Sequence, residues 1–288
     1  MKYLLLALAS FFLAGVVALA GSRGGLMTGS WPILTIVFLI TFLIQWIMYV
    51  PSYLWQTEKF FDLTGSLTYI IVIVLSLLLI DATSIRTILM ATMITFWSVR
   101  LGSFLFLRVM KDGEDKRFKQ IKTSGARFFM TWSLQGLWVF LTAACALTAI
   151  TSGKTIAMGF WGYLGTLLWV LGFLIEVIAD RQKQQFRIDE NNQNKFITSG
   201  LWSISRHPNY FGEVLLWTGI ACMALPTLSG LQWVTLISPV FVYLLIRYVS
   251  GVPMLEESAD RKWGDIEAYQ MYKAKTPIFF PYFIRVKP

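Results

Sequence analysis

Long apolar stretches separated by short polar segments run along the whole chain. Most reach the roughly 17–25 residues that cross about 30 Å of hydrocarbon, and none shows the two-residue alternation of a transmembrane β-strand. The pattern predicts an all-α, polytopic transmembrane helical bundle of about seven or eight spans. The first stretch resembles a signal peptide, but it has no clear cleavage site, so we expect a retained helix. The expected spans are residues 3–20, 31–53, 62–80, 87–109, 128–150, 158–178, 210–225 and 231–248.

Composition and charge agree with a membrane protein. The 288 residues are 56% hydrophobic and 14% charged, whereas soluble domains are about 45–50% apolar and about 25% charged. The net charge of +9 comes mainly from one set of loops, because the other set carries only Arg23, Arg86 and Lys154. Basic loops stay in the cytoplasm, so we expect both termini there and need no nucleic-acid partner to explain the charge.

Residue types that bind transition metals are scarce. His207 is the only histidine, and the two cysteines, Cys145 and Cys222, both lie inside apolar stretches. Neither cysteine belongs to a C-x-x-C pair. The sequence therefore argues against a disulfide, a zinc site or any other metal site.

The polar stretch between the sixth and seventh spans holds the densest set of chemically useful side chains. Asp180, Lys183 and Arg187 are spaced i, i+3 and i+7, so on a continuing helix they share one face. An alternative for this face alone is a solvated helix end with snorkelling basic side chains.

The next segment, S-R-H-P-N-Y (205–210), leads directly into the seventh span. Pro208 suits the first turn of a helix, whose free N–H groups and dipole attract phosphate. Arg206 can add a pair of donors, while Trp202 and Tyr210 offer flat faces to a nucleobase. Glu213 is a costly carboxylate just inside a span, which indicates a partner or ligand. The segment predicts a phosphate-bearing cofactor at the membrane surface, although His207 taken alone would be an ordinary surface histidine.

Polar residues in the early spans form a second candidate group. Asp62 and Tyr69 are seven residues apart on one helix face, which indicates a polar site in an apolar cavity. The alternative is that Asp62 caps its helix and Tyr69 belongs to the interfacial aromatic belt. Arg100 lies in the middle of the fourth span and Arg247 near the inner end of the eighth, where a charge needs a partner or a ligand.

These motifs resemble the steroid 5-alpha-reductase and sterol reductase superfamily, in particular its bacterial DUF1295 branch. The specific strings are D-x-x-K-x-x-F-R (180–187) and S-R-H-P-N-Y-F-G-E (205–213), supported by D-L-T-G-S-L-T-Y (62–69) and K-W-G-D-I-E-A-Y-Q-M-Y-K (262–273). The resemblance covers roughly residues 55–288. It implies an integral protein of the bacterial inner membrane that acts in lipid metabolism.

The resemblance also implies a reaction and its residues. NADPH at the cytoplasmic face would reduce an activated C=C bond in a steroid-like or other hydrophobic lipid taken from the bilayer, with no protein partner required. Residues 1–127 would form the substrate half, with Asp62, Tyr69 and Arg100 catalytic, and residues 128–288 the cofactor half. The family takes its tyrosine from near Trp97, where this chain has none, so Tyr69 is the substitute. The implied cofactor residues are Asp180, Lys183, Arg187, Trp202, Arg206, His207, Asn209, Tyr210, Glu213 and Arg247.

Two other classes stay open. Isoprenylcysteine carboxyl methyltransferases, which bind S-adenosylmethionine, also carry R-H-P-x-Y-x-G near a paired glutamate such as Glu256-Glu257. A transporter or assembly factor would instead need a polar path across several spans. Asn209, Glu213 and the upstream D-x-x-K-x-x-F-R favour the reductase.

Overall fold

The computed structural model describes residues 1–281, apart from the side chains of Asp112 and Lys116. Within them, the strands are β1 (Met27–Thr28) and β2 (Trp31–Pro32), which pair antiparallel in a short hairpin. Seven helical stretches among the described residues are long and apolar enough to cross a membrane. The structure thus confirms the predicted all-α, membrane-spanning bundle of seven or eight spans.

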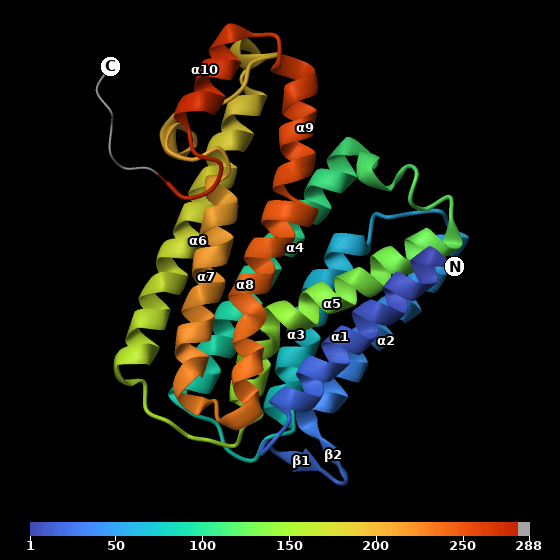
Figure 1. Cartoon of the computed structure of the whole chain (residues 1–288), viewed down its shortest axis with the longest axis vertical. Helices are drawn as coiled ribbons and strands as arrows, with labels where there is room; N and C mark the ends of the chain where they lie inside the picture. The colour runs from blue at the N-terminus through green and yellow to red at the C-terminus, as the bar shows by residue number, and fades with distance from the viewer. Residues whose placement is uncertain (282–288) are drawn as a thin grey trace. The chain divides into compact units, whose positions relative to one another are not determined.

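The helices follow the apolar pattern closely (Figure 1). The α-helices are α1 (Lys2–Gly21), α2 (Ile33–Leu54), α3 (Phe61–Leu78), α4 (Ile85–Asp112), α5 (Gly125–Ile150), α6 (Gly159–Ile188), α7 (Pro208–Ala224), α8 (Ile237–Leu244), α9 (Val252–Trp263) and α10 (Glu267–Lys275).

The eighth expected span differs from the prediction. Residues 231–248 do not form one regular helix: a 3₁₀ helix, η5 (Gly230–Leu236), precedes α8, and a π-helical turn, η6 (Leu245–Val249), follows it. The segment 262–273, which carries one of the family strings, is not one continuous helix, because α9 ends at Trp263 and α10 begins at Glu267. The glycine at 264, a poor helix former, stands at this break.

Two compact units make up the chain. Unit 1 contains Met1–Tyr163 and Ile220–Ser238, and unit 2 contains Leu164–Gly219 and the described residues from Pro239 onward. These boundaries are structural. The assignment of residues 1–127 to the substrate half and of residues 128–288 to the cofactor half stays a prediction. The three candidate catalytic residues all belong to unit 1, and the ten candidate cofactor residues all belong to unit 2.

Unit 1 is built around α5, which is far more buried than its neighbours and packs against α1, α2 and α3. Its interior holds a chain of hydrogen bonds between helices. Gln135 Nε2 donates to Gln45 Oε1 at 2.9 Å and to the Phe61 carbonyl oxygen at 2.9 Å, and Gln45 Nε2 donates to Thr68 Oγ1 at 2.8 Å. Such bonds join helices where hydrocarbon offers polar groups no other partner.

Arg86 is a second buried polar anchor of unit 1. Its side chain is almost fully buried and donates to backbone carbonyls, including Met223 O at 2.6 Å and Ala157 O at 2.5 Å. The guanidinium thereby ties the segment between α5 and α6 to the end of α7. Carbonyl dipoles take the place of a carboxylate in stabilising this buried charge.

Unit 2 depends on close contact between α6 and α7, which lie side by side in Figure 1. A Cβ atom added at Gly172 would lie 2.5 Å from Leu216 N and 2.6 Å from Gly212 O. One added at Gly219 would lie 2.5 Å from Gly165 O. The backbones touch because these positions carry no side chain, as at small-residue helix interfaces in membranes.

Gly172→Ala is expected to lower the thermal unfolding midpoint of the purified protein, because its methyl group would overlap backbone atoms of α7. Overpacking of this kind costs about 1–3 kcal/mol. The matched control is Gly15→Ala in α1, where the added Cβ would meet only the tip of Phe38 at 3.5 Å. Equal midpoints for the two variants would contradict the close packing of α6 on α7.

Candidate functional site

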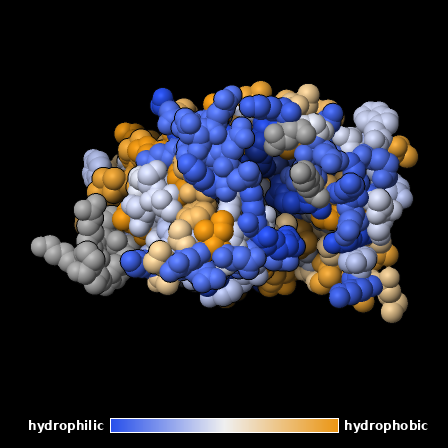
Figure 2. Space-filling view, turned by 90° about the horizontal axis from the view of Figure 1, so that it is seen from above, coloured by the Kyte–Doolittle hydropathy of each residue, from blue (hydrophilic) through white to orange (hydrophobic). Residues whose placement is uncertain are grey.

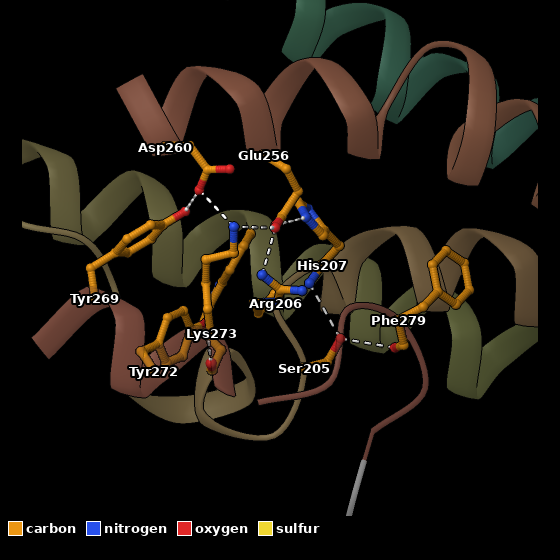
Figure 3. A network of polar contacts seen from close by, with 10 residues as sticks. Ser205, Arg206, His207, Glu256, Asp260, Tyr269, Tyr272, Lys273 and Phe279 are labelled. Carbon is orange, nitrogen blue, oxygen red and sulfur yellow. Dashed lines mark hydrogen bonds and ion pairs between the residues drawn. The ribbon is translucent and has the colours of Figure 1, made fainter. Parts of the chain in front are cut away.

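The polar segment before α7 and the polar helices near the C-terminus meet in one network of unit 2 (Figure 3). Figure 2 looks onto the end of the molecule where α10 lies and shows hydrophilic residues gathered there. α7 begins at Pro208, as the sequence predicts, so Ser205, Arg206 and His207 stand immediately before the first turn of the helix. The free N–H groups of this turn and the helix dipole favour an anion here.

Glu256 of α9 lies at the centre of the network. Its Oε2 accepts from Arg206 Nη1 at 2.5 Å, and its Oε1 lies 2.8 Å from His207 Nε2. The Arg206 and His207 side chains are only 9% and 5% exposed, so both contacts are shielded from water. Charge-assisted hydrogen bonds of this length are the strong class in proteins.

A second set of contacts joins α9 to α10. Lys273 Nζ donates to Asp260 Oδ1 at 2.7 Å and lies 3.9 Å from Glu256 Oε2, and Tyr269 Oη donates to Asp260 at 3.1 Å. Tyr272 Oη donates to the Trp202 carbonyl oxygen at 2.7 Å. Glu256 and Asp260 of α9, one turn apart, therefore each contact a cation.

The segment that follows α10 holds residues 205 and 206 in place. Arg206 N donates to the Pro277 carbonyl oxygen at 2.9 Å, and Ser205 Oγ donates to the Phe279 carbonyl oxygen at 2.9 Å. The backbone before α7 is thus fixed by residues more than 70 positions away in the sequence.

The start of α7 also contacts the polar face of α6. Because α6 continues to Ile188, Asp180, Lys183 and Arg187 lie on one helix, as expected. Asn209 Nδ2 donates to Asp180 Oδ1 at 3.2 Å, and Lys183 Nζ lies 4.5 Å from the centre of the Trp202 ring. Trp202 is buried, and its indole N–H donates to the Ala179 carbonyl oxygen at 3.1 Å.

Other predicted cofactor residues lie around this centre. Tyr210 stacks on the His207 ring, with centroids 5.6 Å apart and planes 17° apart. Glu213 is buried in α7, whereas Arg187 is exposed at the end of α6. Arg247 lies in the π-helical turn, with its guanidinium carbon 5.0 Å from the centre of the Tyr248 ring.

Three buried atoms of this cluster have no hydrogen-bond partner among the described residues: Arg206 Nε, His207 Nδ1 and Asn209 Oδ1. Burial lowers the pKa of His207 below its usual 6.5, although its hydrogen bond to Glu256 acts in the opposite direction. The neutral ring donates through Nε2 to Glu256, which makes Nδ1 an acceptor. One donor and two acceptors are therefore left for a ligand or water, since buried polar groups are rarely unsatisfied.

In unit 1, Asp62 lies in the first turn of α3 and does not cap it, because the N-cap residue is Phe60. Its carboxylate is 15% exposed and 3.8 Å from Arg117 Nη2. Tyr69 is buried instead of lying in an exposed aromatic belt, with its ring edge-on to Trp97 at 5.4 Å. Arg100 lies against Phe104, with Cζ 5.4 Å from the ring centre.

Glu58 holds the basic loop between α4 and α5 against the start of α3. This glutamate is almost fully buried and accepts from Lys122 Nζ at 2.6 Å and from Asp115 N at 2.9 Å. Phe118 of the same loop packs into an aromatic cluster with Phe128 and Trp132. Arg117 is thereby placed beside Asp62.

Asp260 is not among the residues expected from the sequence, Lys273 appears there only as the last residue of the string 262–273, and Glu256 only as part of a glutamate pair. The available signal was the spacing of Glu256 and Asp260, which is i, i+4 on a polar helix. Nothing local in the sequence pairs Glu256 with Arg206, which lies 50 positions earlier.

Comparison with known proteins gives a consistent family relation. A family profile described as "Protein of unknown function (DUF1295)" matches residues 46–276. The chain is 25% identical over 225 residues to an uncharacterized protein of Schizosaccharomyces pombe, covering 68% of this chain and 63% of that protein. It is 29% identical over 143 residues to a protein of Acanthamoeba polyphaga mimivirus named "Probable 7-dehydrocholesterol reductase", covering 43% and 30% of the two chains.

A third relative, of Ustilaginoidea virens, is named "Probable O-methyltransferase" and is 29% identical over 94 residues, covering 33% of this chain and 32% of its own length. The matched regions span less than two thirds of the length of each of these relatives. No solved structure matches the chain significantly.

The lone histidine permits a clean pH test. Because burial depresses the pKa of folded His207 below its usual 6.5, the unfolded chain takes up the proton first as pH falls. The stability contribution of the neutral ring is complete above pH 6.5 and is lost as pH falls toward the lower pKa of the folded state. Wild type is therefore expected to lose thermal stability relative to His207→Gln between about pH 7.5 and 5. If the difference in melting temperature between wild type and His207→Gln is the same at every pH, His207 is not buried as a neutral ring.

Proposed function

This chain belongs to the DUF1295 family, one of the steroid 5-alpha-reductase-like groups of proteins, and we propose that it is an NADPH-dependent reductase embedded in the membrane. Its substrate is a steroid-like or other hydrophobic lipid that carries an activated C=C bond and reaches the enzyme from the bilayer. The observation that carries the proposal is the buried cluster before α7. There, cationic side chains and partnerless polar atoms lie at the first turn of a helix.

The residues of unit 2 suit a dinucleotide. Arg206 and Lys273 offer positive charge, the first turn of α7 offers backbone N–H groups, and Tyr210 offers an aromatic ring. The buried Trp202 lies under Lys183 and supports it from within. Arg206 Nε, His207 Nδ1 and Asn209 Oδ1, which have no partner among the described residues, fit a ligand with both hydrogen-bond acceptors and donors. Phosphate oxygens are such acceptors, and ribose hydroxyls are such donors. We assign Asp180, Lys183 and Glu213 to the same site, with Arg187 and Arg247 at its edges.

The residues of unit 1 suit polarisation of a carbonyl group. The family pattern places its tyrosine near Trp97, and Tyr69 of α3 packs edge-on against that tryptophan. We assign Tyr69 as the donor to the substrate carbonyl, Asp62 as the carboxylate that orients it, and Arg100 as a supporting cation. When bound, NADPH supplies the hydride for the β-carbon of the enone. The Tyr69 hydroxyl stabilises the enolate oxygen in a dry site until a proton reaches the α-carbon.

The proposed setting is the inner membrane of a bacterium, with both termini and the network before α7 in the cytoplasm. Support comes from the distribution of lysine and arginine among the loops. A soluble cofactor would then reach the network from the cytoplasm, while the lipid substrate enters from the hydrocarbon.

One observation favours a second candidate function. One relative is named "Probable O-methyltransferase", and Glu256 of the glutamate pair binds Arg206 and His207 directly. A membrane methyltransferase that uses S-adenosylmethionine is therefore the alternative. The two cofactors differ in charge, since NADPH is strongly anionic and S-adenosylmethionine carries a sulfonium cation.

Ligand-induced thermal stabilisation distinguishes the two functions. NADPH at about 100 times its Kd should stabilise the purified protein by about 2.7 kcal/mol, and S-adenosylmethionine should not. Arg206→Met should weaken NADPH binding by roughly tenfold or more, because a charge-assisted hydrogen bond contributes about 1.5–3 kcal/mol. Arg261→Met is the control, because Arg261 lies on α9 in an exposed pair with Glu257. Tighter binding of the methyl donor by wild type would contradict the reductase.

Tyr69→Phe tests the catalytic assignment. With a 3-oxo-4-ene steroid as probe substrate, turnover should fall about 10²–10³-fold, the usual effect of removing one donor to a developing oxyanion. NADPH affinity should stay near that of wild type, since Tyr69 belongs to unit 1. Tyr163→Phe, at an exposed tyrosine, is the matched control. Unchanged turnover in Tyr69→Phe would remove this residue from the mechanism.

A further inference from the structure

We propose that Glu256 is the internal counter-anion of the network before α7: its carboxylate occupies the place where an anionic ligand binds, and the ligand must exchange with it. Glu256 then sets the affinity of the site. The helix that carries it, α9, is the element that moves away from the network when the ligand binds. This inference rests on the proposed anion-binding function of the same site. It adds a residue that controls binding by competing with the ligand.

The contacts of Glu256 are those that an anionic ligand would make. Arg206 Nη1 at 2.5 Å, His207 Nε2 at 2.8 Å and Lys273 Nζ at 3.9 Å converge on this one carboxylate. They come from the segment before α7 and from α10, so Glu256 bridges two elements as a bound phosphate would. Figure 3 shows the side chains pointing toward the same carboxylate.

Charge balance makes exchange necessary. Within the network, Arg206 and Lys273 face Glu256 and Asp260, so two positive charges already meet two negative ones. A ligand with several negative charges would meet a carboxylate at close range, which is unfavourable in a poorly solvated place. If the acidic residues of α9 move away, the same cations are free to bind the ligand. Arg206 then offers Nη1 together with Nε, which has no partner among the described residues.

The surroundings of α9 allow the whole helix to move away from Arg206 and Lys273. Glu256 and Asp260 are one turn apart on α9, so one movement withdraws both. α9 follows the π-helical turn Leu245–Val249, a kind of irregularity often found at functional sites. A Cβ at Gly251 would lie 2.9 Å from the Tyr210 ring, and Tyr210 stacks on His207. The start of α9 therefore contacts the ring that stacks on His207.

The decisive experiment compares Glu256→Gln with wild type in titrations with NADPH and, separately, with inorganic pyrophosphate. Removing the competing charge should strengthen binding of both probes by roughly tenfold, which corresponds to about 1.4 kcal/mol. Glu257→Gln is the matched control, because the Glu257 side chain is 69% exposed and pairs with the equally exposed Arg261. It should bind both probes as wild type does. Weaker binding by Glu256→Gln would overturn the proposal, because it would show that Glu256 positions Arg206 and His207 for the ligand.

The outcomes also separate this inference from the proposed function. If wild type binds no NADPH but Glu256→Gln binds pyrophosphate more tightly, the reductase proposal fails and the counter-anion stands. If wild type binds NADPH and Glu256→Gln binds it with equal or lower affinity, the counter-anion proposal fails and the reductase proposal stands. Absence of binding by either protein overturns both.

Hydrogen–deuterium exchange on wild type covers the case in which Glu256→Gln does not fold. Saturating NADPH should accelerate exchange in residues 252–263, because α9 loses its contacts with Arg206 and Lys273. Slower exchange in α9 on ligand addition would contradict release.

Discussion

Backbone contact between α6 and α7 is the constraint on which the candidate cofactor site depends. Glycines at 172, 212 and 219 let the two helices touch without intervening side chains. The polar extension of α6 is thereby brought beside the start of α7, where Asn209 binds Asp180 and Lys183 lies over Trp202. Bulkier residues at these positions would separate the two halves of the site, although every polar residue was still present.

In unit 1, polar side chains inside the apolar bundle are stabilised by hydrogen bonds to one another and to the backbone. Gln45, Thr68 and Gln135 bond to one another between helices, and Arg86 bonds to backbone carbonyls. The same unit holds Asp62 beside Arg117 and Tyr69 beside Trp97. Fixed polar groups in low-dielectric surroundings suit a reaction that places charge on a carbonyl oxygen.

Much of the fold follows from the sequence, because hydrophobic length is a strong and local signal. The bounds of most helices, the start of α7 at Pro208 and the continuation of α6 past Asp180 are all predictable in this way. The break-up of residues 231–248 is not, since an apolar run has the same pattern whether its turns are α, 3₁₀ or π. The partners of Arg206 and His207 lie about 50 positions away on a polar helix, and no short-range periodicity links them.

The candidate catalytic group shows the same limit. Sequence spacing puts Asp62 and Tyr69 on one helix face, but only the packing of α3 against α4 shows that Tyr69 meets Trp97.

The central claim is that the cluster before α7 holds NADPH. The most direct measurement is a structure of the protein in lipid nanodiscs with NADPH and S-adenosylmethionine at equal concentration. The account predicts density for the dinucleotide against Arg206 and His207, with Glu256 turned away. Density for the methyl donor at these residues, or for the dinucleotide elsewhere, would contradict it.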